Sequence, residues 1–362
     1  MTTPTPRPGV LSVDPYIGGL HSVDGCDEVI VLASNETPIG PSAKAVAAYN
    51  AECGRLHRYP DGHATDLRAA IGRRFGCDPE RIVCGAGSDE LIQMLIRAYA
   101  GPGDEVLYSR HGFSIYRIFA LGAGATPVAA PEKVLTADVD ALLSKVTERT
   151  RLLFIANPNN PTGSYLSAPE LQRLRDGLRD DVLLVVDSAY AEYVSRNDYA
   201  AGIEMVDSHD NVVMTRTFSK IFGLAALRLG WVYCPAAVAD VLNRLRGPFN
   251  VNAAAQSAGI AAIEDTAHQE ASRAHNDQWL PWLTTAVGAL GLTVHPSVGN
   301  FVLVQFAGPE AADAAYQHLL SAGIITRKMG GYELPDCLRV TIGLESEMRA
   351  VADQLAMHLK KS

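Results

Sequence analysis

Three short apolar runs in the middle of the chain predict buried parallel strands. They cover residues 151–156, 182–186 and 211–214, and none alternates apolar with polar positions. A strand that is covered on both faces of its sheet has this pattern. Ligands of open α/β sheets bind beyond the carboxyl ends of the strands, so the residues that follow each run are the first candidates for chemistry.

The region from about residue 64 to 250 alternates predicted helices with predicted strands. Helices are expected at 65–75, 89–99 and from about 114, and two further strands at 81–84 and 105–108. Alternation of this kind predicts a mostly parallel sheet covered by helices on both faces.

The pattern changes after Gly247 and Pro248. Residues 252–290 are rich in alanine and predict helix broken only at Pro281. Strands at 301–304 and 337–342 and amphipathic helices at 309–321 and 345–359 then predict a smaller α+β domain. We expect an N-terminal arm at 1–30, with a strand at 29–33 after it. The small domain would take 31–54 and 252–362, and the large α/β domain would take 55–251.

Composition narrows the function classes. The chain has 362 residues, 48% hydrophobic and 20% charged residues, and a net charge of −9. These values are typical of a globular protein, and the acidic balance argues against nucleic-acid and membrane partners. The six cysteines include no C-x-x-C pair and no metal-ligand spacing, so we expect no metal. Without a secretory signal pattern or a membrane span, the cytoplasm is the expected location.

The polar residues that follow the three runs suit an aromatic aldehyde phosphate bound by a lysine. Lys220 is the candidate for the covalent link, because apolar neighbours would lower the pKa of its amine. Asp187 ends an apolar run and would keep a ring nitrogen protonated, although it could also be a helix cap. Asn160 and Tyr190 would donate to a ring oxygen, although Asn160 also fits a turn.

The phosphate of such a cofactor needs hydroxyls, backbone amides and an arginine. Thr217, Ser219 and Arg228 can supply the side chains. Residues 87–89 (Gly87, Ser88 and Asp89) lie at a strand-to-helix junction, where free amides bind anions. The third glycine of a dinucleotide fingerprint is replaced by Glu90, which argues against a nicotinamide or flavin site.

Several motifs resemble the fold-type I pyridoxal-phosphate (PLP) aminotransferases. They are NPNNPTG at 157–163, DSAY at 187–190 and SKIFGLAALRLG at 219–230. LASNE at 32–36, RYPD at 58–61, GSDE at 87–90 and LRVTIG at 338–343 resemble the histidinol-phosphate branch in particular. The resemblance runs from about residue 16 to the C-terminus. It departs from the usual family pattern at Thr37, Ser188 and Ala226, none of which removes a chemical group that the family uses.

This resemblance implies a fold-type I PLP-dependent α/β transferase with a mostly parallel central sheet and a smaller α+β domain. It implies a homodimer whose active sites lie at the subunit interface. Phe113 would stack on the cofactor ring, and Tyr59 would reach the cofactor phosphate of the neighbouring subunit. The substrate would contact four residues: Tyr16, Asn35, Arg327 and Arg339.

The leading functional interpretation is amino transfer between histidinol phosphate and 2-oxoglutarate in histidine biosynthesis. An aromatic amino acid aminotransferase is the nearest alternative, and a PLP lyase such as a threonine-phosphate decarboxylase is a second. A PLP-sensing regulator is disfavoured, because such regulators carry an N-terminal DNA-binding helix-turn-helix, whereas this chain enters the aminotransferase pattern by about residue 29.

Overall fold

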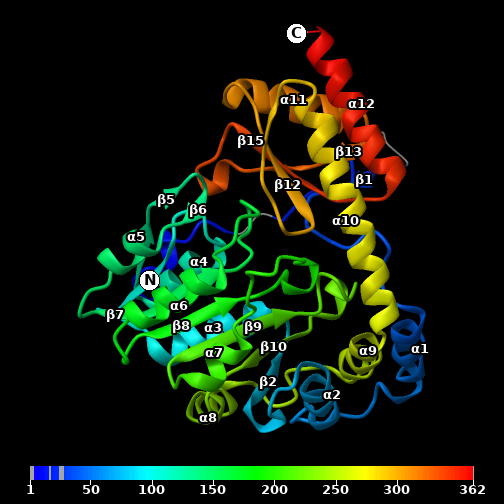
Figure 1. Ribbon diagram of the computed structural model, residues 1–362. Helices are drawn as coiled ribbons and strands as arrows, with labels where there is room; N and C mark the ends of the chain where they lie inside the picture. The colour runs from blue at the N-terminus through cyan, green and yellow to red at the C-terminus, as the bar shows by residue number, and fades with distance from the viewer. Residues whose placement is uncertain (1–3, 16–17, 24–27, 362) are drawn as a thin grey trace.

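A seven-stranded sheet forms the centre of the large domain in this computed structural model, which describes residues 4–15, 18–23 and 28–361 (Figure 1). In spatial order the strands are β2 (Ile82–Gly85), β10 (Gly230–Tyr233), β9 (Val212–Thr217), β8 (Leu183–Asp187), β7 (Thr150–Ala156), β3 (Glu105–Ser109) and β4 (Thr126–Ala130). β10 runs antiparallel to both of its neighbours, and the other pairs are parallel. The predicted mostly parallel sheet is confirmed.

Helices bury both faces of this sheet. They are α2 (Thr65–Phe75), α3 (Ser88–Tyr99), α4 (Ile115–Ala123), α5 (Val139–Ser144), α6 (Ala168–Gly177), α7 (Ile203–Ser208) and α8 (Ala236–Leu245). Alternate residues of β8 show the two faces: Leu184 and Val186 belong to one apolar core, and Leu183 and Val185 to the other. Because both faces are covered, the central positions of β7 and β8 are apolar without alternation, and polar residues such as Asp187 stand at the strand ends.

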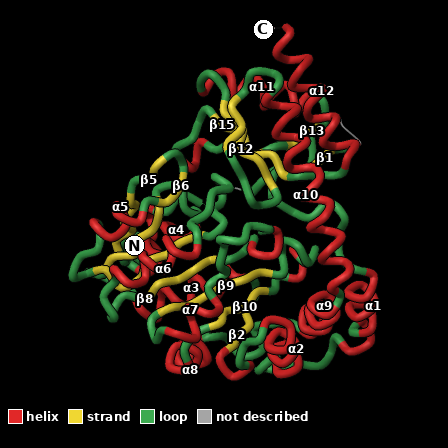
Figure 2. Tube along the Cα trace, in the orientation of Figure 1, coloured by secondary structure: helices red, strands yellow, loops and turns green. Residues whose placement is uncertain are grey.

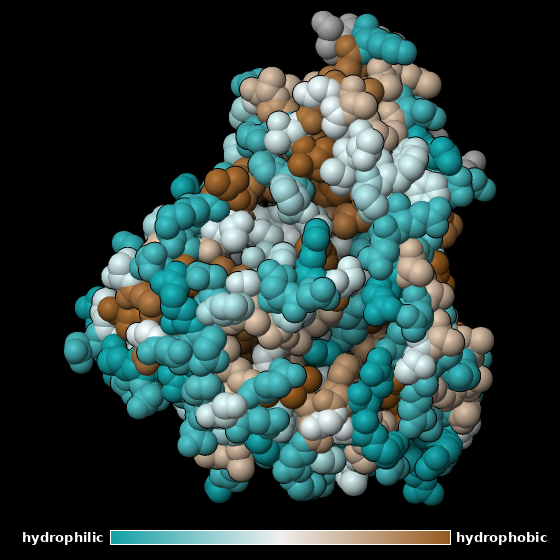
Figure 3. Space-filling view, viewed as in Figure 1, coloured by the Kyte–Doolittle hydropathy of each residue, from teal (hydrophilic) through white to brown (hydrophobic). Residues whose placement is uncertain are grey.

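A second, smaller sheet lies above the first in Figure 2, and Figure 3 shows the corresponding smaller lobe. Its strand order is β11 (Thr293–His295), β12 (Phe301–Gln305), β15 (Cys337–Thr341) and β14 (Arg327–Lys328), all antiparallel. β1 (Ile30–Val31) pairs with β13 (Ile324–Ile325), and α11 (Pro309–Ser321) and α12 (Glu345–Lys361) complete the layer. The predicted α+β character of this region is confirmed.

The predicted helix break at Pro281 is wrong. The chain breaks at Asp265, between α9 (Ala253–Glu264) and α10 (Thr266–Gly288), and Pro281 lies inside α10. The amide of Gln269 donates to the carbonyls of Ala262 and Ile263, which satisfies the end of α9. The apolar face of α10 packs into the small core through Trp279, and this burial offsets the backbone hydrogen bond that proline removes.

Packing groups α9 with the large sheet. α1 (Ala43–Ala51) lies against α9, and Ala45 and Ala255 share the apolar core beside that sheet. Trp279 of α10 belongs instead to the core of the small sheet. The change from one core to the other therefore falls along α10, whereas the sequence-based boundaries of the small domain began at residues 31 and 252. The helical periodicity of the sequence predicts which face of a helix is buried. It does not predict which of the two apolar cores that face packs against.

The described part of the N-terminal arm packs on its own chain. Its short helix η1 (Val10–Ser12) lies against α4, and Arg7 Nη2 donates to the carbonyl of Gly122 at 3.1 Å. None of the helices in the described ranges is long and apolar enough to cross a membrane.

Candidate active site

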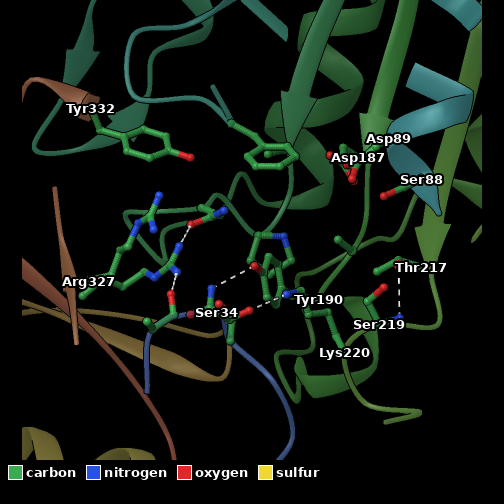
Figure 4. A pocket seen from close by; sticks show the side chains of 18 of the residues that line it. Ser34, Ser88, Asp89, Asp187, Tyr190, Thr217, Ser219, Lys220, Arg327 and Tyr332 are labelled. Carbon is green, nitrogen blue, oxygen red and sulfur yellow. Dashed lines mark hydrogen bonds between the residues drawn. The ribbon is translucent and has the colours of Figure 1, made fainter. Parts of the chain in front are cut away.

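A pocket lies where the carboxyl ends of β7, β8 and β9 face the small domain (Figure 4). The large domain lines it with Ser88, Asp89, Phe113, Asn160, Asp187, Tyr190, Thr217, Ser219, Lys220 and Arg228. The N-terminal segment and the small domain add Ser34, Asn35, Arg327, Tyr332 and Arg339. Most residues that the sequence singled out are therefore neighbours in space.

Lys220 follows β9 and lies partly buried in this pocket. Its Nζ donates to the carbonyl of Ser34 at 2.9 Å. Burial, supported by the charge of Arg339, lowers the pKa of Lys220 to about 8. An amine with this pKa is neutral in a substantial fraction of molecules near neutral pH, so Lys220 can act as a nucleophile and as a proton carrier.

Asp187 is the last residue of β8 and is also buried. Tyr116 Oη donates to its Oδ2 at 2.7 Å, and Thr215 Oγ1 donates to its Oδ1 at 3.2 Å. Burial raises the pKa of Asp187 to about 6, although the two hydrogen bonds act in the opposite direction. A carboxyl group in this setting is poised to share a proton with a basic nitrogen. The sequence reasoning missed Tyr116, because a tyrosine three residues after Phe113 reads as an ordinary core position.

Tyr190 is connected to the N-terminal segment of the pocket. Asn35 Nδ2 donates to Tyr190 Oη at 2.9 Å, and burial raises the pKa of Tyr190 to about 12. The backbone of Asn35 is fixed in turn, because its N–H donates to Thr341 Oγ1 at 3.0 Å and its carbonyl accepts from Asn300. Asn35 has a φ of 56°, a region that asparagine enters more readily than most residues.

One end of the pocket combines a helix N-terminus with an arginine, a combination that suits an anion. α3 begins there, and its N-cap Gly87 provides no side chain to cap the first amides. Arg228 Nη1 donates to Ser219 Oγ at 3.3 Å, and its Nη2 donates to Asp89 Oδ2 at 3.2 Å. A Cβ at Gly87 would stand 2.5 Å from Arg228 Nη2, so glycine is what lets the guanidinium approach the helix start. The predicted role of Gly87 therefore rests on its backbone.

The opposite end of the pocket carries two arginines. Arg339 on β15 is buried; its Nη2 donates to the carbonyl of Ala33 at 2.5 Å, and its Nη1 donates to Asn160 Oδ1. Arg327 on the adjacent strand β14 stands directly opposite Arg339 in the strand register. Tyr332 contacts Ser114 Oγ through its hydroxyl at 3.3 Å and lines the same end. No sequence pattern pointed to Tyr332, which ends the short helical turn Gly330–Tyr332.

One predicted residue, Tyr59, does not line this pocket. Tyr59 is 82% exposed, and its ring stacks on that of Phe249 at 4.6 Å, apart from the pocket of its own chain. Tyr16 lies outside the described residues.

The pocket fits PLP. It combines a buried carboxyl group for the ring nitrogen, a phenol and an amide for the ring oxygen, and a lysine of lowered pKa. Phe113 supplies an aromatic face, and the start of α3 with Arg228, Ser219 and Thr217 supplies the cradle for a phosphate. Figure 4 shows Asp187, Tyr190 and Lys220 among the labelled side chains that line this one pocket. Among the described residues no cluster of histidine, cysteine and carboxylate side chains could hold a metal ion.

Comparison with known proteins agrees with this geometry. Residues 27–355 match the family model described as aminotransferase class I and II. The chain is 60% identical to a histidinol-phosphate aminotransferase of Paramagnetospirillum magneticum, with 98% of each chain covered. It is also 60% identical to a histidinol-phosphate aminotransferase of Rhodospirillum centenum, over 99% of this chain and 100% of that one.

The solved structures show the same fold. The histidinol-phosphate aminotransferase of Sinorhizobium meliloti, in complex with pyridoxal-5'-phosphate, superposes with a TM-score of 0.88 at 28% identity and covers 92% of each chain. The family model matches most of the chain, and two relatives match nearly all of it. This chain belongs to the class I and II aminotransferases.

Proposed function

We propose that the protein is a PLP-dependent histidinol-phosphate aminotransferase, which exchanges an amino group between histidinol phosphate and 2-oxoglutarate. The other two reaction partners are imidazole acetol phosphate and glutamate. The observation that carries the proposal is the pair Arg339 and Arg327 at the end of the pocket away from the phosphate cradle. The names of the full-length relatives support the same substrate.

The two arginines suit both amino donors. Histidinol phosphate carries a phosphate ester where glutamate carries its α-carboxylate, so one site must bind either anion. A planar, permanently charged guanidinium binds carboxylate and phosphate in the same bidentate manner. Arg339 is held by Ala33 and Asn160 and would present its fork in a fixed direction, while Arg327 adds charge for the larger anion.

When bound, PLP supplies the electron sink that the reaction requires. The protein supplies the rest. Lys220 would hold the cofactor and could move a proton at the substrate Cα. Asp187, oriented by Tyr116 and Thr215, would keep a proton on the ring nitrogen. Asn160 and Tyr190 would donate to the ring oxygen, and Phe113 would supply an aromatic surface for the ring.

We further propose that the enzyme is a cytoplasmic homodimer and that Tyr59 completes the phosphate site of the partner subunit. Three observations support the dimer: Tyr59 is highly exposed, it is stacked on Phe249, and Leu56 nearby is 76% exposed. Free cysteines, four of them buried, are typical of a reducing compartment.

A panel of amino donors would test the substrate. Purified enzyme loaded with PLP is given histidinol phosphate, phenylalanine, tyrosine or threonine phosphate together with 2-oxoglutarate, and glutamate formation is measured. We expect the highest kcat/KM for histidinol phosphate. A higher kcat/KM for phenylalanine or tyrosine would identify an aromatic amino acid aminotransferase instead. Release of carbon dioxide from threonine phosphate without glutamate formation would identify a lyase.

A further inference from the structure

A buried carboxylate outside the pocket connects two of its loops. β5 (Glu132–Lys133) and β6 (Thr136–Ala137) form a short hairpin, called here the 132–137 hairpin. The side chain of Glu132 is only 3% exposed, while that of its neighbour Lys133 is 72% exposed. The proposed chemistry gives Glu132 no task, and a buried carboxylate is costly unless several donors satisfy it.

Those donors come from the last residue of β3 and from the loop that follows it. Glu132 Oε1 accepts from Ser109 Oγ and from the backbone N–H of His111 at 3.0 Å. Glu132 Oε2 lies 2.7 Å from His111 Nδ1, and the His111 side chain is 9% exposed. Burial alone would raise the pKa of Glu132, but the hydrogen bonds from His111 and Ser109 hold it below its usual value. The carboxylate thus fixes both the backbone and the ring of His111.

His111 passes this constraint to the loop after β7. Its carbonyl accepts from Asn159 Nδ2 at 3.1 Å, and the same amide donates to Thr162 Oγ1 at 2.8 Å. Thr162 contacts Ser164 Oγ at 2.8 Å, and Ser164 Oγ donates at 2.7 Å to the carbonyl of Leu135, back in the 132–137 hairpin. The hydrogen bonds therefore run from the hairpin through both loops and return to it.

The two loops carry groups that line the active site. Phe113 lies two residues after His111, and Asn160 follows Asn159 directly. Side chains of a site hold their geometry only if the residues around them are fixed. We propose that Glu132 and His111 are positioning residues, which set where Phe113 and Asn160 stand against the bound cofactor. This inference rests on the proposed function, since it takes PLP as the ligand.

The test uses full-length protein freed of PLP. PLP is titrated back to measure its dissociation constant, and the circular dichroism of the bound cofactor is recorded, because this signal reports the orientation of the ring. We expect Glu132→Ala to raise the dissociation constant about tenfold and to reduce the dichroism, within the range of effects transmitted through packed networks. Glu132→Gln should restore most of both signals, because its amide oxygen still accepts from Ser109 and from the His111 N–H.

Two further variants serve as a negative control and as a milder change to the same hydrogen-bond network. Lys133→Gln changes the exposed neighbour in the same hairpin and should bind PLP as the wild type does. Ser109→Ala removes a single donor to Glu132 and should weaken PLP binding by a smaller factor, which tests the idea even if Glu132→Ala folds poorly. Melting of each cofactor-free variant separates loss of stability from loss of binding.

The outcomes distinguish this inference from the proposed function. If Glu132→Ala and Ser109→Ala lower the melting temperature but bind PLP with unchanged affinity and dichroism, the pair is merely structural and the inference is wrong. If wild-type protein binds PLP but does not use histidinol phosphate, the proposed substrate is wrong and the binding comparison still decides the inference. If wild-type protein binds no PLP, both are overturned.

Discussion

The hydroxyl of Tyr116 donates a 2.7 Å hydrogen bond to Oδ2 of Asp187, and both side chains are buried. Tyr116 is itself held by stacking on Phe154, with ring centroids 4.7 Å apart. The carboxyl group that we assign to the cofactor nitrogen is therefore oriented before any ligand arrives. Orientation of this kind reduces the reorganisation needed during catalysis.

Asp187→Asn is expected to have two effects. It should stabilise the cofactor-free protein at pH 7.5, and it should remove most of the activity of the PLP-loaded enzyme. Burial raises the pKa of Asp187 from 3.8 to about 6, so the folded protein holds this proton more tightly than the unfolded chain does. The free energy of unfolding of the wild-type protein therefore falls as pH rises from about 4 through 6. The fall is on the order of 2–3 kcal/mol, since one pKa unit corresponds to about 1.4 kcal/mol. Asparagine has no charge to bury, so thermal melting at several pH values should show the gain above pH 6 and little gain at pH 4.

A matched control exists at the surface. Tyr165 donates to Asp198 at 2.8 Å in the same manner, but Asp198 is exposed. Asp198→Asn should leave the pH dependence of melting unchanged. If Asp187→Asn also leaves the pH dependence of melting unchanged, burial does not raise the pKa of Asp187 in the folded protein.

Lys220 should react with PLP faster as pH rises, with a midpoint near 8. Its pKa is lowered to about 8 mainly by burial and secondarily by Arg339, and the neutral amine is the reactive form. Borohydride reduction at a series of pH values, followed by peptide mapping, measures the labelled fraction. Lys220→Ala should lose this label and nearly all turnover, whereas Lys328→Ala at an exposed site should lose neither. Label that persists on another lysine would refute the assignment.

Arg339→Ala is expected to reduce kcat/KM for both histidinol phosphate and glutamate by about 30-fold or more. Removal of one partner of a buried charged contact costs ~2–5 kcal/mol, and 1.4 kcal/mol corresponds to a factor of ten in rate. Single-turnover rates with each donor measure the effect. Arg349→Ala, an exposed arginine paired with Glu345, serves as the control. A loss confined to one donor would mean that the two anions bind at different places.

The shared dimer site can be tested by mixing subunits. If Tyr59 acts across the interface, a dimer of one Lys220→Ala chain and one Tyr59→Ala chain contains one site with both residues intact. Mixing the two variants under conditions of subunit exchange should therefore restore activity above that of either alone. Tyr59→Ala chains that gain nothing from such mixing would place Tyr59 outside the partner's site, and a fully active monomer by light scattering would exclude a shared site.

Much of the site could be predicted because its residues follow recognisable strands. Asp187 ends β8 and Lys220 follows β9, so parallel strand order alone places them at one edge of the sheet. Tyr116 and Tyr332 were missed for a physical reason: their roles depend on which side chains face them across the fold. The sequence around Tyr116 is that of any buried amphipathic helix.

The division of the chain into cores was the least predictable part of the fold. Ala45 and Ala255 are small residues that suit any close helix contact, so their types contain no information about the partner core. The expected break at Pro281 does not occur, because packing of Trp279 in the small core holds α10 together across the proline. Local chemistry predicts elements well, and it predicts their distant contacts poorly.

The course of α10 has a consequence for how the protein denatures. Its first residues join α9, where Gln269 satisfies carbonyls next to the large core, and its later residues, including Leu283, fill the small core. Neither core can melt without disrupting part of the same continuous helix. Loss of either core would therefore weaken the helix on which the other core packs, and this couples the stability of the two domains although each has an apolar interior of its own.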